Sequence, residues 1–170
     1  MGMFASGVTI VTVAHEGQMH GMTANSVMSV SLRPPLVAVA VDERALTNTL
    51  IREAGHFALN ILTEDQEQLA ERFAKPRARG AELFDGVSFE AGQNGDPLLD
   101  GCIGRVSCEL TSSHVEGDHS LFVGRAVAFS SSSAEGNPLI FYRGRFSSVS
   151  CQFCIVRNDP MVALLAMHES

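Results

Sequence analysis

Residues 101–129, GCIGRVSCELTSSHVEGDHSLFVGRAVAF, contain two long runs with a clear strand pattern. Apolar and polar residues alternate from Gly101 to His114 and again from His119 to Phe129, which is the period of a half-buried strand. Glu116-Gly117-Asp118 lies between the two runs and is typical of a tight turn. The stretch therefore predicts two long antiparallel strands joined in a hairpin.

The flanking sequence predicts further strands, again arranged mainly as hairpins. Runs rich in apolar and β-branched residues predict strands at residues 7–14, 19–23, 36–41, 56–62 and 138–142. Strands outnumber helices by roughly seven to three, and they do not alternate with helices as in βαβ units. No G-x-G-x-x-G follows a strand, which disfavours a doubly wound dinucleotide-binding fold. We expect a mainly β protein, an antiparallel barrel with a few peripheral helices.

Two helices are predicted outside the long hairpin. Thr47 to Ala54 has helical spacing of apolar residues and is closed by Gly55. Thr63-Glu64-Asp65-Gln66 has the pattern of a capping box and predicts a helix that runs to about Phe73. We interpret residues 25–32 as a serine-rich connection and residues 84–100 as irregular.

Composition narrows the class of protein. The 170 residues are 45% hydrophobic and only 18% charged, whereas a soluble domain carries about 25% charged residues. We expect one ordered domain whose surplus apolar surface is covered by a second copy in a homodimer. The net charge of −7 provides no general attraction to nucleic acid or to an anionic membrane. No apolar run approaches the roughly 18 residues that span a bilayer, and we expect a cytoplasmic protein.

The four cysteines do not form the spacing of a metal site. Cys151 and Cys154 make a single C-x-x-C, whereas structural zinc usually needs two such pairs. Cys102 and Cys108 are too far apart in an extended run to chelate one ion together. We expect no metal and interpret the cysteines as reduced thiols of a cytosolic protein.

Two polar segments next to strands are candidate ligand-binding sites. Thr23-Ala24-Asn25-Ser26, with the serines that follow, is an array of small donors that suits a phosphate or a flat heterocycle, or else a plain turn. Asp42 to Thr47 joins a buried strand to a helix, where unpaired amides and Arg44 would attract an anion or a ring carbonyl. The alternative is that Asp42 or Thr47 only caps the helix.

Three further segments contain cations or a histidine beside aromatic residues. Arg72, Phe73 and Lys75 end a helix together, which suits either phosphate contact or ordinary helix C-terminal charge. His119 follows a turn and is either a stacking partner for a nicotinamide or a surface histidine. The run from Phe141 to Phe146 carries two arginines that fit a pyrophosphate, or an ordinary basic strand end. The common hydrolase and nucleotide-triphosphatase motifs are absent from the sequence.

Taken in order, these segments resemble the small flavin reductases that serve as reductase components of two-component flavin monooxygenases. The resemblance covers roughly residues 3 to 146. It rests on eight pieces of sequence, namely FASGVTIVT at 4–12, GMTANS at 21–26, SVSL with PPL at 29–36, FALNIL at 57–62, Q66 with LA and RFA at 69–74, PLLDG at 97–101, GDH at 117–119 and YRGR at 142–145.

The resemblance implies a split β-barrel, a homodimer and a flavin, FMN or FAD, in a groove near the dimer interface. It implies NADH or NADPH as hydride donor and a separate oxygenase that receives the reduced flavin. By resemblance, Thr23, Ala24, Asn25, Ser26, Ser31, Arg44 and Thr47 would contact the flavin, and Arg72, Phe73 and Lys75 would hold its phosphate end. The nicotinamide side would be formed by His119, Tyr142, Arg143 and Gly144, with His119 and Arg143 as the residues closest to the chemistry.

The resemblance leaves the last part of the chain and the electron acceptor open. We divide the chain into a flavin reductase-like domain over residues 1–146 and a C-terminal tail over residues 147–170. One alternative function is a reductase with bound FMN that passes electrons to a non-flavin acceptor such as a cobalt corrinoid. Another is a flavin- or haem-binding module without catalysis, since a fold does not by itself fix a function.

Overall fold

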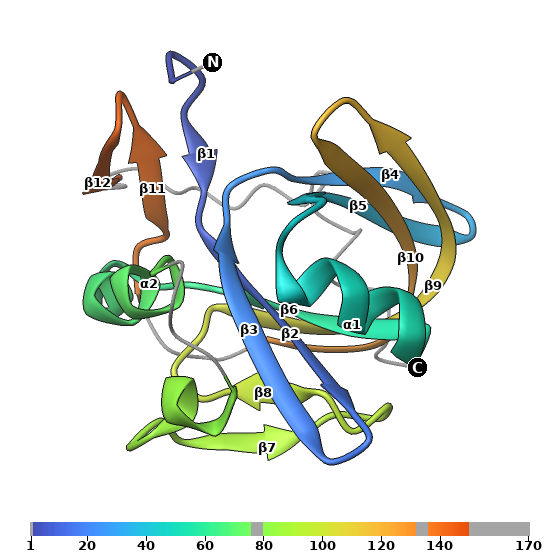
Figure 1. Cartoon of the computed structure of the whole chain (residues 1–170). Helices are drawn as coiled ribbons and strands as arrows, with labels where there is room; N and C mark the ends of the chain where they lie inside the picture. Colours follow the sequence, from blue (N-terminus) through green and yellow to red (C-terminus); the bar gives the residue numbers. More distant parts are fainter. Residues whose placement is uncertain (1, 76–79, 132–135, 150–170) are drawn as a thin grey trace.

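The computed structural model describes residues 2–75, 80–131 and 136–149, and its centre is an antiparallel sheet (Figure 1). The strands are β1 Ser6–Gly7, β2 Thr9–His15, β3 Gln18–Ala24, β4 Val27–Leu32, β5 Pro35–Asp42, β6 His56–Ile61, β7 Phe89–Ala91, β8 Pro97–Leu99, β9 Gly104–Glu116, β10 His119–Ser131, β11 Leu139–Tyr142 and β12 Arg145–Ser148. The helices are α1 Leu46–Ala54 and α2 Glu67–Phe73, with short 3-10 turns η1 Glu64–Gln66 and η2 Gly80–Phe84.

The predicted hairpin of β9 and β10 is confirmed and forms the middle of a seven-stranded sheet in the order β3-β2-β6-β9-β10-β5-β4. Its turn is closed by Gly117, which has a φ of 67°. The ladder shifts register beside Gly124, where a Cβ would lie 2.6 Å from the ring of Phe57. A side chain is therefore excluded at this position, and the bulged ladder bends around the phenylalanine ring.

Two buried clusters hold the sheet to its helices. The first packs α1, through Leu50 and Ile51, onto strand residues such as Phe57 and Phe122. The second lies on the side of α2, where Phe73 and neighbouring apolar residues pack with the 3-10 turn η2 and β8. Because α1 and α2 are fixed by separate clusters, the space between them can stay open to solvent.

Both predicted helices are confirmed, with a small change at the start of the second. Gly55 closes α1 with a φ of 72°, and its amide donates to the carbonyl of Ile51. The amide of Thr63 donates to Oε1 of Gln66 at 3.1 Å, as in the predicted capping box. The first turn after Thr63 is 3-10, and the α-helix begins at Glu67.

Three segments differ from the sequence expectation. Residues 27–32 form the edge strand β4, because their serines can remain at a sheet edge while the backbone pairs with β5. The segment expected to be irregular contains the short hairpin of β7 and β8, and β12 follows the last predicted strand. Strands of three or four residues are too short to produce a readable alternation. Cys151, Cys154 and most of the tail lie outside the described residues.

Within the ranges that the structure describes, no helix is both long enough and apolar enough to cross a membrane.

Candidate functional site

A groove opens where β3, the loop between β5 and α1, and the end of α2 meet. Its volume is about 520 Å³, within the range of small-molecule sites. It is lined by His20, Gly21, Met22, Thr23, Asp42, Arg44, Ala45, Leu46, Thr47, Phe73, Ala74 and Lys75. These residues come from three separate stretches of chain, so the groove exists only in the folded protein. We call it the β3–α1–α2 groove.

The first turn of α1 lines one side of the groove through Ala45, Leu46 and Thr47. The N-cap is Ala45, which has no capping side chain, so the alternative in which Asp42 or Thr47 caps the helix is wrong. Thr47 is fully buried, and no group among the described residues lies within hydrogen-bond distance of its Oγ1. A buried hydroxyl without a partner carries a desolvation cost, which a ligand oxygen or nitrogen in the groove would remove. The first turn of α1 therefore holds an unused hydrogen-bonding group beside the groove.

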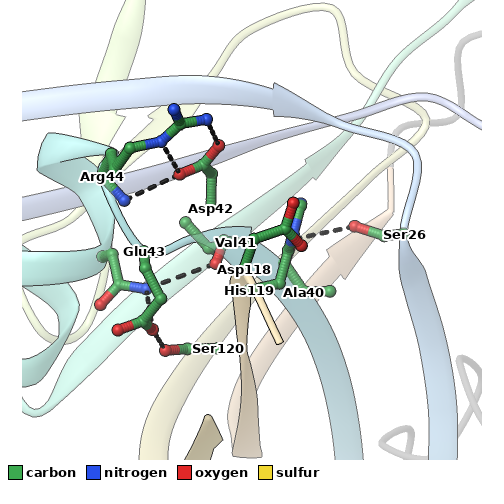
Figure 2. Close-up of polar contacts among 10 residues, drawn as sticks. Ser26, Ala40, Val41, Asp42, Glu43, Arg44, Asp118, His119 and Ser120 are labelled. Carbon is green, nitrogen blue, oxygen red and sulfur yellow. Dashed lines mark hydrogen bonds and ion pairs between the residues drawn. The ribbon is translucent and has the colours of Figure 1, made fainter. Parts of the chain in front are cut away.

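Asp42 and Arg44 form an ion pair at the rim of the groove (Figure 2). Nε and Nη2 of Arg44 donate to the two carboxylate oxygens at 3.1 and 2.9 Å, and the Arg44 amide adds a third bond at 2.8 Å. These hydrogen bonds lower the pKa of Asp42 to about 2 and raise the pKa of Arg44. The guanidinium is largely exposed, so it could turn toward an anionic ligand without leaving the rim.

Phe73 and Lys75 form the wall contributed by the end of α2. The ring of Phe73 packs edge-on against Phe84, with centroids 5.3 Å apart. Thr23 fixes β3 to this helix, because its Oγ1 donates to the carbonyl of Ala70 at 2.7 Å. An aromatic ring and a cation thus stand opposite the first turn of α1, which suits a flat ligand that carries a negative charge.

Five of the residues predicted to contact the flavin meet in this groove, namely Thr23, Arg44, Thr47, Phe73 and Lys75. The other five, Arg72 among them, do not line it. Ala24 is buried in the core, Asn25 is exposed, Ser31 lies on β4, and Ser26 donates to the carbonyl of Ala40 at 2.9 Å.

Arg72 points away from the groove. Its Nη1 donates to the carbonyl of Asp85 at 2.8 Å, and it lines a second hollow of about 320 Å³. Helical spacing explains the difference, because adjacent residues such as Arg72 and Phe73 project in directions about 100° apart.

His119 lies at the start of β10, directly opposite Asp42 in the ladder with β5. Its Nδ1 is 2.7 Å from the carboxylate of Asp118, and this hydrogen bond lowers the pKa of Asp118. The imidazole is about half exposed. His119 does not itself line the groove, but the backbone pairing places it directly beside Asp42, which does.

Tyr142, Arg143 and Gly144 do not line this groove. They form the turn between β11 and β12, and Arg143 lies 5.3 Å over the ring of Tyr142. Tyr142 and Arg143 line a separate hollow of about 490 Å³ with Arg145, Phe146 and Ser147. Within one chain, the residues predicted to bind the nicotinamide therefore lie at two separate places. His119 lies beside Asp42, whereas Tyr142, Arg143 and Gly144 lie at the β11–β12 turn.

The sequence interpretation missed several residues of the groove, among them His20, Met22 and Leu46. A signal existed for the first two, because alternation along the predicted strand at residues 19–23 places His20 and Met22 on one face. Leu46 offered no comparable signal, since a leucine at a helix start is usually a packing residue.

A family model and individual relatives of known function point to the same family. The family model described as "Flavin reductase like domain" matches residues 1–150. An NADH-dependent flavin reductase from a Rhodococcus species is 45% identical over 163 residues, which are 94% of this chain and 87% of the relative. The reductase component of a 4-nitrophenol monooxygenase from Rhodococcus opacus is 42% identical, covering 86% of this chain and 76% of the relative.

A solved structure resembles the whole described fold. It is the NADH:FAD oxidoreductase of Streptomyces globisporus in complex with NAD and FAD fragments, with a TM-score of 0.82 and 34% sequence identity. The match covers 89% of each chain. The predicted mainly β split barrel is thereby confirmed.

Proposed function

The chain belongs to the family of flavin reductase-like domains, and we propose that it is an NAD(P)H-dependent flavin oxidoreductase that reduces FMN or FAD. Two of the relatives named above are an NADH-dependent flavin reductase and an NADH:FAD oxidoreductase, which makes NADH the expected donor. The reduced flavin would then supply a separate monooxygenase, as the name of the Rhodococcus opacus relative indicates for that protein.

The observation that carries the proposal for the site is the β3–α1–α2 groove with the buried hydroxyl of Thr47. An isoalloxazine ring is flat and has polar atoms along one edge. The groove offers a polar edge at the first turn of α1 and an aromatic wall at Phe73, so the residues present fit the ring. Lys75 and Arg44 would contact the phosphate end or the ring carbonyls from the two rims.

A bound flavin supplies the reactivity, because its N5 accepts a hydride from C4 of the nicotinamide. The chain then has to align the two rings and to stabilise negative charge. The amides of the first turn of α1 and the hydroxyl of Thr47 would supply donors at one edge of the groove, and the exposed guanidinium of Arg44 would turn toward the ring from the rim. No side chain is needed as a general base, since the transfer of a hydride requires none.

We assign the nicotinamide side to His119, Arg143, Tyr142 and Gly144. His119 is supported by its place directly opposite Asp42. Arg143 and Tyr142 are supported by their stacked arrangement on the β11–β12 turn, which suits a base or a pyrophosphate. Asn25, Ser26, Ser31 and Arg72 are proposed as outer contacts, and Arg72 would have to release the Asp85 carbonyl to take part.

We further propose a homodimer. The edge strand β4 exposes Met28, Val30 and Leu32, with exposed fractions of 58, 47 and 50%. An exposed apolar edge strand is prone to pair with another chain unless it is covered, and a second copy would cover it. A cytoplasmic location agrees with the two free, buried thiols Cys102 and Cys108.

Turnover with free flavin tests the function. The purified protein should oxidise NADH when FMN or FAD is added in excess, and the flavin should leave the protein after reduction. Retention of a flavin through gel filtration, with electrons passed to an added cobalt corrinoid, would instead support the alternative acceptor. Failure to oxidise either NADH or NADPH with either flavin would refute the proposed activity.

A further inference from the structure

Behind the rim of the groove, five polar side chains form a cluster that the function above does not use. Its members are Glu43, Asn48, Arg52, Ser113 and Ser120, and we call it the polar clamp. They come from the β5–α1 loop, from α1, from β9 and from β10. The polar clamp therefore joins residues 43–52 to residues 113–120, two regions that are far apart in the sequence.

Arg52 is the centre of the polar clamp. Its Nε donates to Oδ1 of Asn48 at 3.0 Å, its Nη1 to Oγ of Ser113 at 2.9 Å, and its Nη2 to Oγ of Ser120 at 2.6 Å. The guanidinium also lies over the ring of Phe122, 5.2 Å from the centroid. A planar group with several fixed donors can bridge three elements in this way, whereas a lysine cannot.

Glu43 closes the polar clamp on the side of the groove. Its carboxylate accepts hydrogen bonds from Ser120 and from Nδ2 of Asn48, and it is 3.5 Å from Nη2 of Arg52. Its backbone amide donates to the carbonyl of Asp118 at 3.0 Å. Two layers of contacts thus join Glu43 to the segment 118–120.

The joined segments carry the two halves of the proposed site. Asp42 and Arg44, on either side of Glu43, line the groove. Asp118 and Ser120 lie on either side of His119. The polar clamp fixes Glu43, which lies between two groove residues, and Ser120, which is next to His119. It therefore sets where His119 lies relative to the groove.

Burial distinguishes the polar clamp from ordinary surface ion pairs. Ser120 is fully buried, and Phe122 beneath Arg52 belongs to the core. The side chains of Arg52 and Glu43 are about one-third exposed. Partly buried groups of a connected network hold one geometry better than a solvated pair does.

We propose that Arg52, Glu43 and Ser120 are positioning residues for hydride transfer, which act by holding the β9–β10 turn, with His119, against the β5–α1 loop. This inference rests on the proposed function. None of the three lines the groove, so they would influence the reaction only through the segments that they join. Small errors of position at a reacting centre reduce rates strongly, up to about 100-fold for 1 Å.

The test compares clamp variants with a matched control. Arg52→Met keeps an apolar stem over Phe122 but removes the donors, Arg52→Lys keeps the charge alone, and Ser120→Ala removes one bridging hydroxyl. Arg125→Met is the control. Arg125 lies on β10, like Ser120, and it is an arginine paired with a glutamate, Glu109, outside the polar clamp. For each protein, anaerobic rapid mixing gives the limiting rate of flavin reduction, and fluorescence quenching gives the flavin Kd.

We expect Arg52→Met to lower the limiting reduction rate about tenfold, while the flavin Kd changes less than about threefold. Arg52→Lys should restore little of the rate, and Ser120→Ala should lower it about threefold without loss of folding. Arg125→Met should behave like the wild type. Equal changes in all four variants, or a change in flavin Kd alone, would overturn the proposal.

A double-mutant cycle with His119→Ala separates positioning from general destabilisation. If the polar clamp acts through His119, Arg52→Met should lower the rate less than about twofold once His119 is alanine. Effects that simply multiply would overturn the proposal even if each variant folds. A wild type that does not reduce flavin would refute the proposed function itself, and the role of the polar clamp with it.

Discussion

The ring of Phe73 lies against the backbone of Gly21, so closely that a Cβ at position 21 would be 2.7 Å from Cε1 of the ring. Both residues line the β3–α1–α2 groove. Phe73 cannot easily retreat, because it is buried and packs edge-on against Phe84. The width of the groove on this side is therefore set by the absence of a side chain on β3.

Gly21→Ala should push the Phe73 ring out of place. We expect a loss of about 1–3 kcal/mol in the free energy of unfolding, as for other overpacked cores, and a several-fold increase in the flavin Kd. Gly7→Ala is the control, since a Cβ there would meet nothing within 4 Å. Urea unfolding and flavin fluorescence measure the two effects. An alanine at position 21 that leaves both unchanged would show that Phe73 does not limit the groove.

Thr47→Val should weaken flavin binding without destabilising the free protein. The substitution replaces a buried hydroxyl that lacks a partner, so the free protein should be as stable as before or slightly more stable. The flavin Kd should rise about tenfold, which corresponds to about 1.4 kcal/mol for one lost hydrogen bond.

Thr12→Val provides the opposite control for that experiment. The hydroxyl of Thr12 donates to the carbonyl of Pro97 at 2.6 Å, and Nδ2 of Asn60 donates to it at 3.0 Å. Loss of the Thr12 hydroxyl should lower the free energy of unfolding by about 1–3 kcal/mol and leave the flavin Kd unchanged. If Thr47→Val were the destabilising variant instead, the Thr47 hydroxyl would have a structural role and not a role in binding.

His119→Ala and Arg143→Ala should reduce the use of NADH more than the binding of flavin. Neither residue lines the β3–α1–α2 groove, and both were assigned to the nicotinamide side. We expect kcat/KM for NADH to fall at least about tenfold, with the flavin Kd within about threefold of the wild type. Steady-state kinetics at saturating flavin measure the first quantity. Loss of flavin binding in proportion would place these residues at the flavin instead.

Stability should fall in alkaline solution because of two buried thiols. Burial raises the pKa of Cys102 to about 11 and that of Cys108 to about 12, from an ordinary value of 9.0. The folded protein holds these protons more tightly than the unfolded chain does. The two thiols therefore contribute fully to the free energy of unfolding below pH 9, and this contribution is lost between about pH 9 and 12. Urea unfolding at several pH values should show this slope, and it should be reduced in a Cys102→Ala/Cys108→Ala variant. An equal slope in both proteins would contradict the assignment.

Val30→Arg should dissociate the proposed dimer. Val30 lies on the edge strand β4 and is 47% exposed in the single chain, so the substitution should be tolerated by the monomer fold. Light scattering should give a dimer for the wild type and a monomer for the variant, because an arginine at the centre of an apolar contact is buried without a partner. A wild type that is monomeric at micromolar concentration would refute the homodimer.

The central hairpin could be predicted because its alternation extends over more than ten residues in each strand, and α1 because Gly55 closes a periodic apolar face. β4 could not, since its serines are equally typical of a loop, and only pairing with β5 makes the segment a strand. Local sequence therefore identifies elements whose own pattern is long, whereas tertiary pairing decides the short ones.

The candidate site shows the same division. Arg44 and Thr47 could be predicted because a strand end followed by a helix start is a local feature with known binding chemistry. The orientation of Arg72 could not, since it depends on the carbonyl of Asp85, thirteen residues further along the chain. The contacts of Arg52 could not be predicted either, because the local sequence of a helical arginine does not indicate the two serines that it contacts on β9 and β10.

A crystal structure of the protein with bound FMN would show whether the β3–α1–α2 groove holds the flavin. We expect the isoalloxazine ring in this groove, with a ring oxygen or nitrogen within hydrogen-bond distance of the Thr47 hydroxyl and the Phe73 ring along its wall. A flavin ring bound at the Tyr142–Ser147 hollow, with the Thr47 hydroxyl still without a partner, would contradict it.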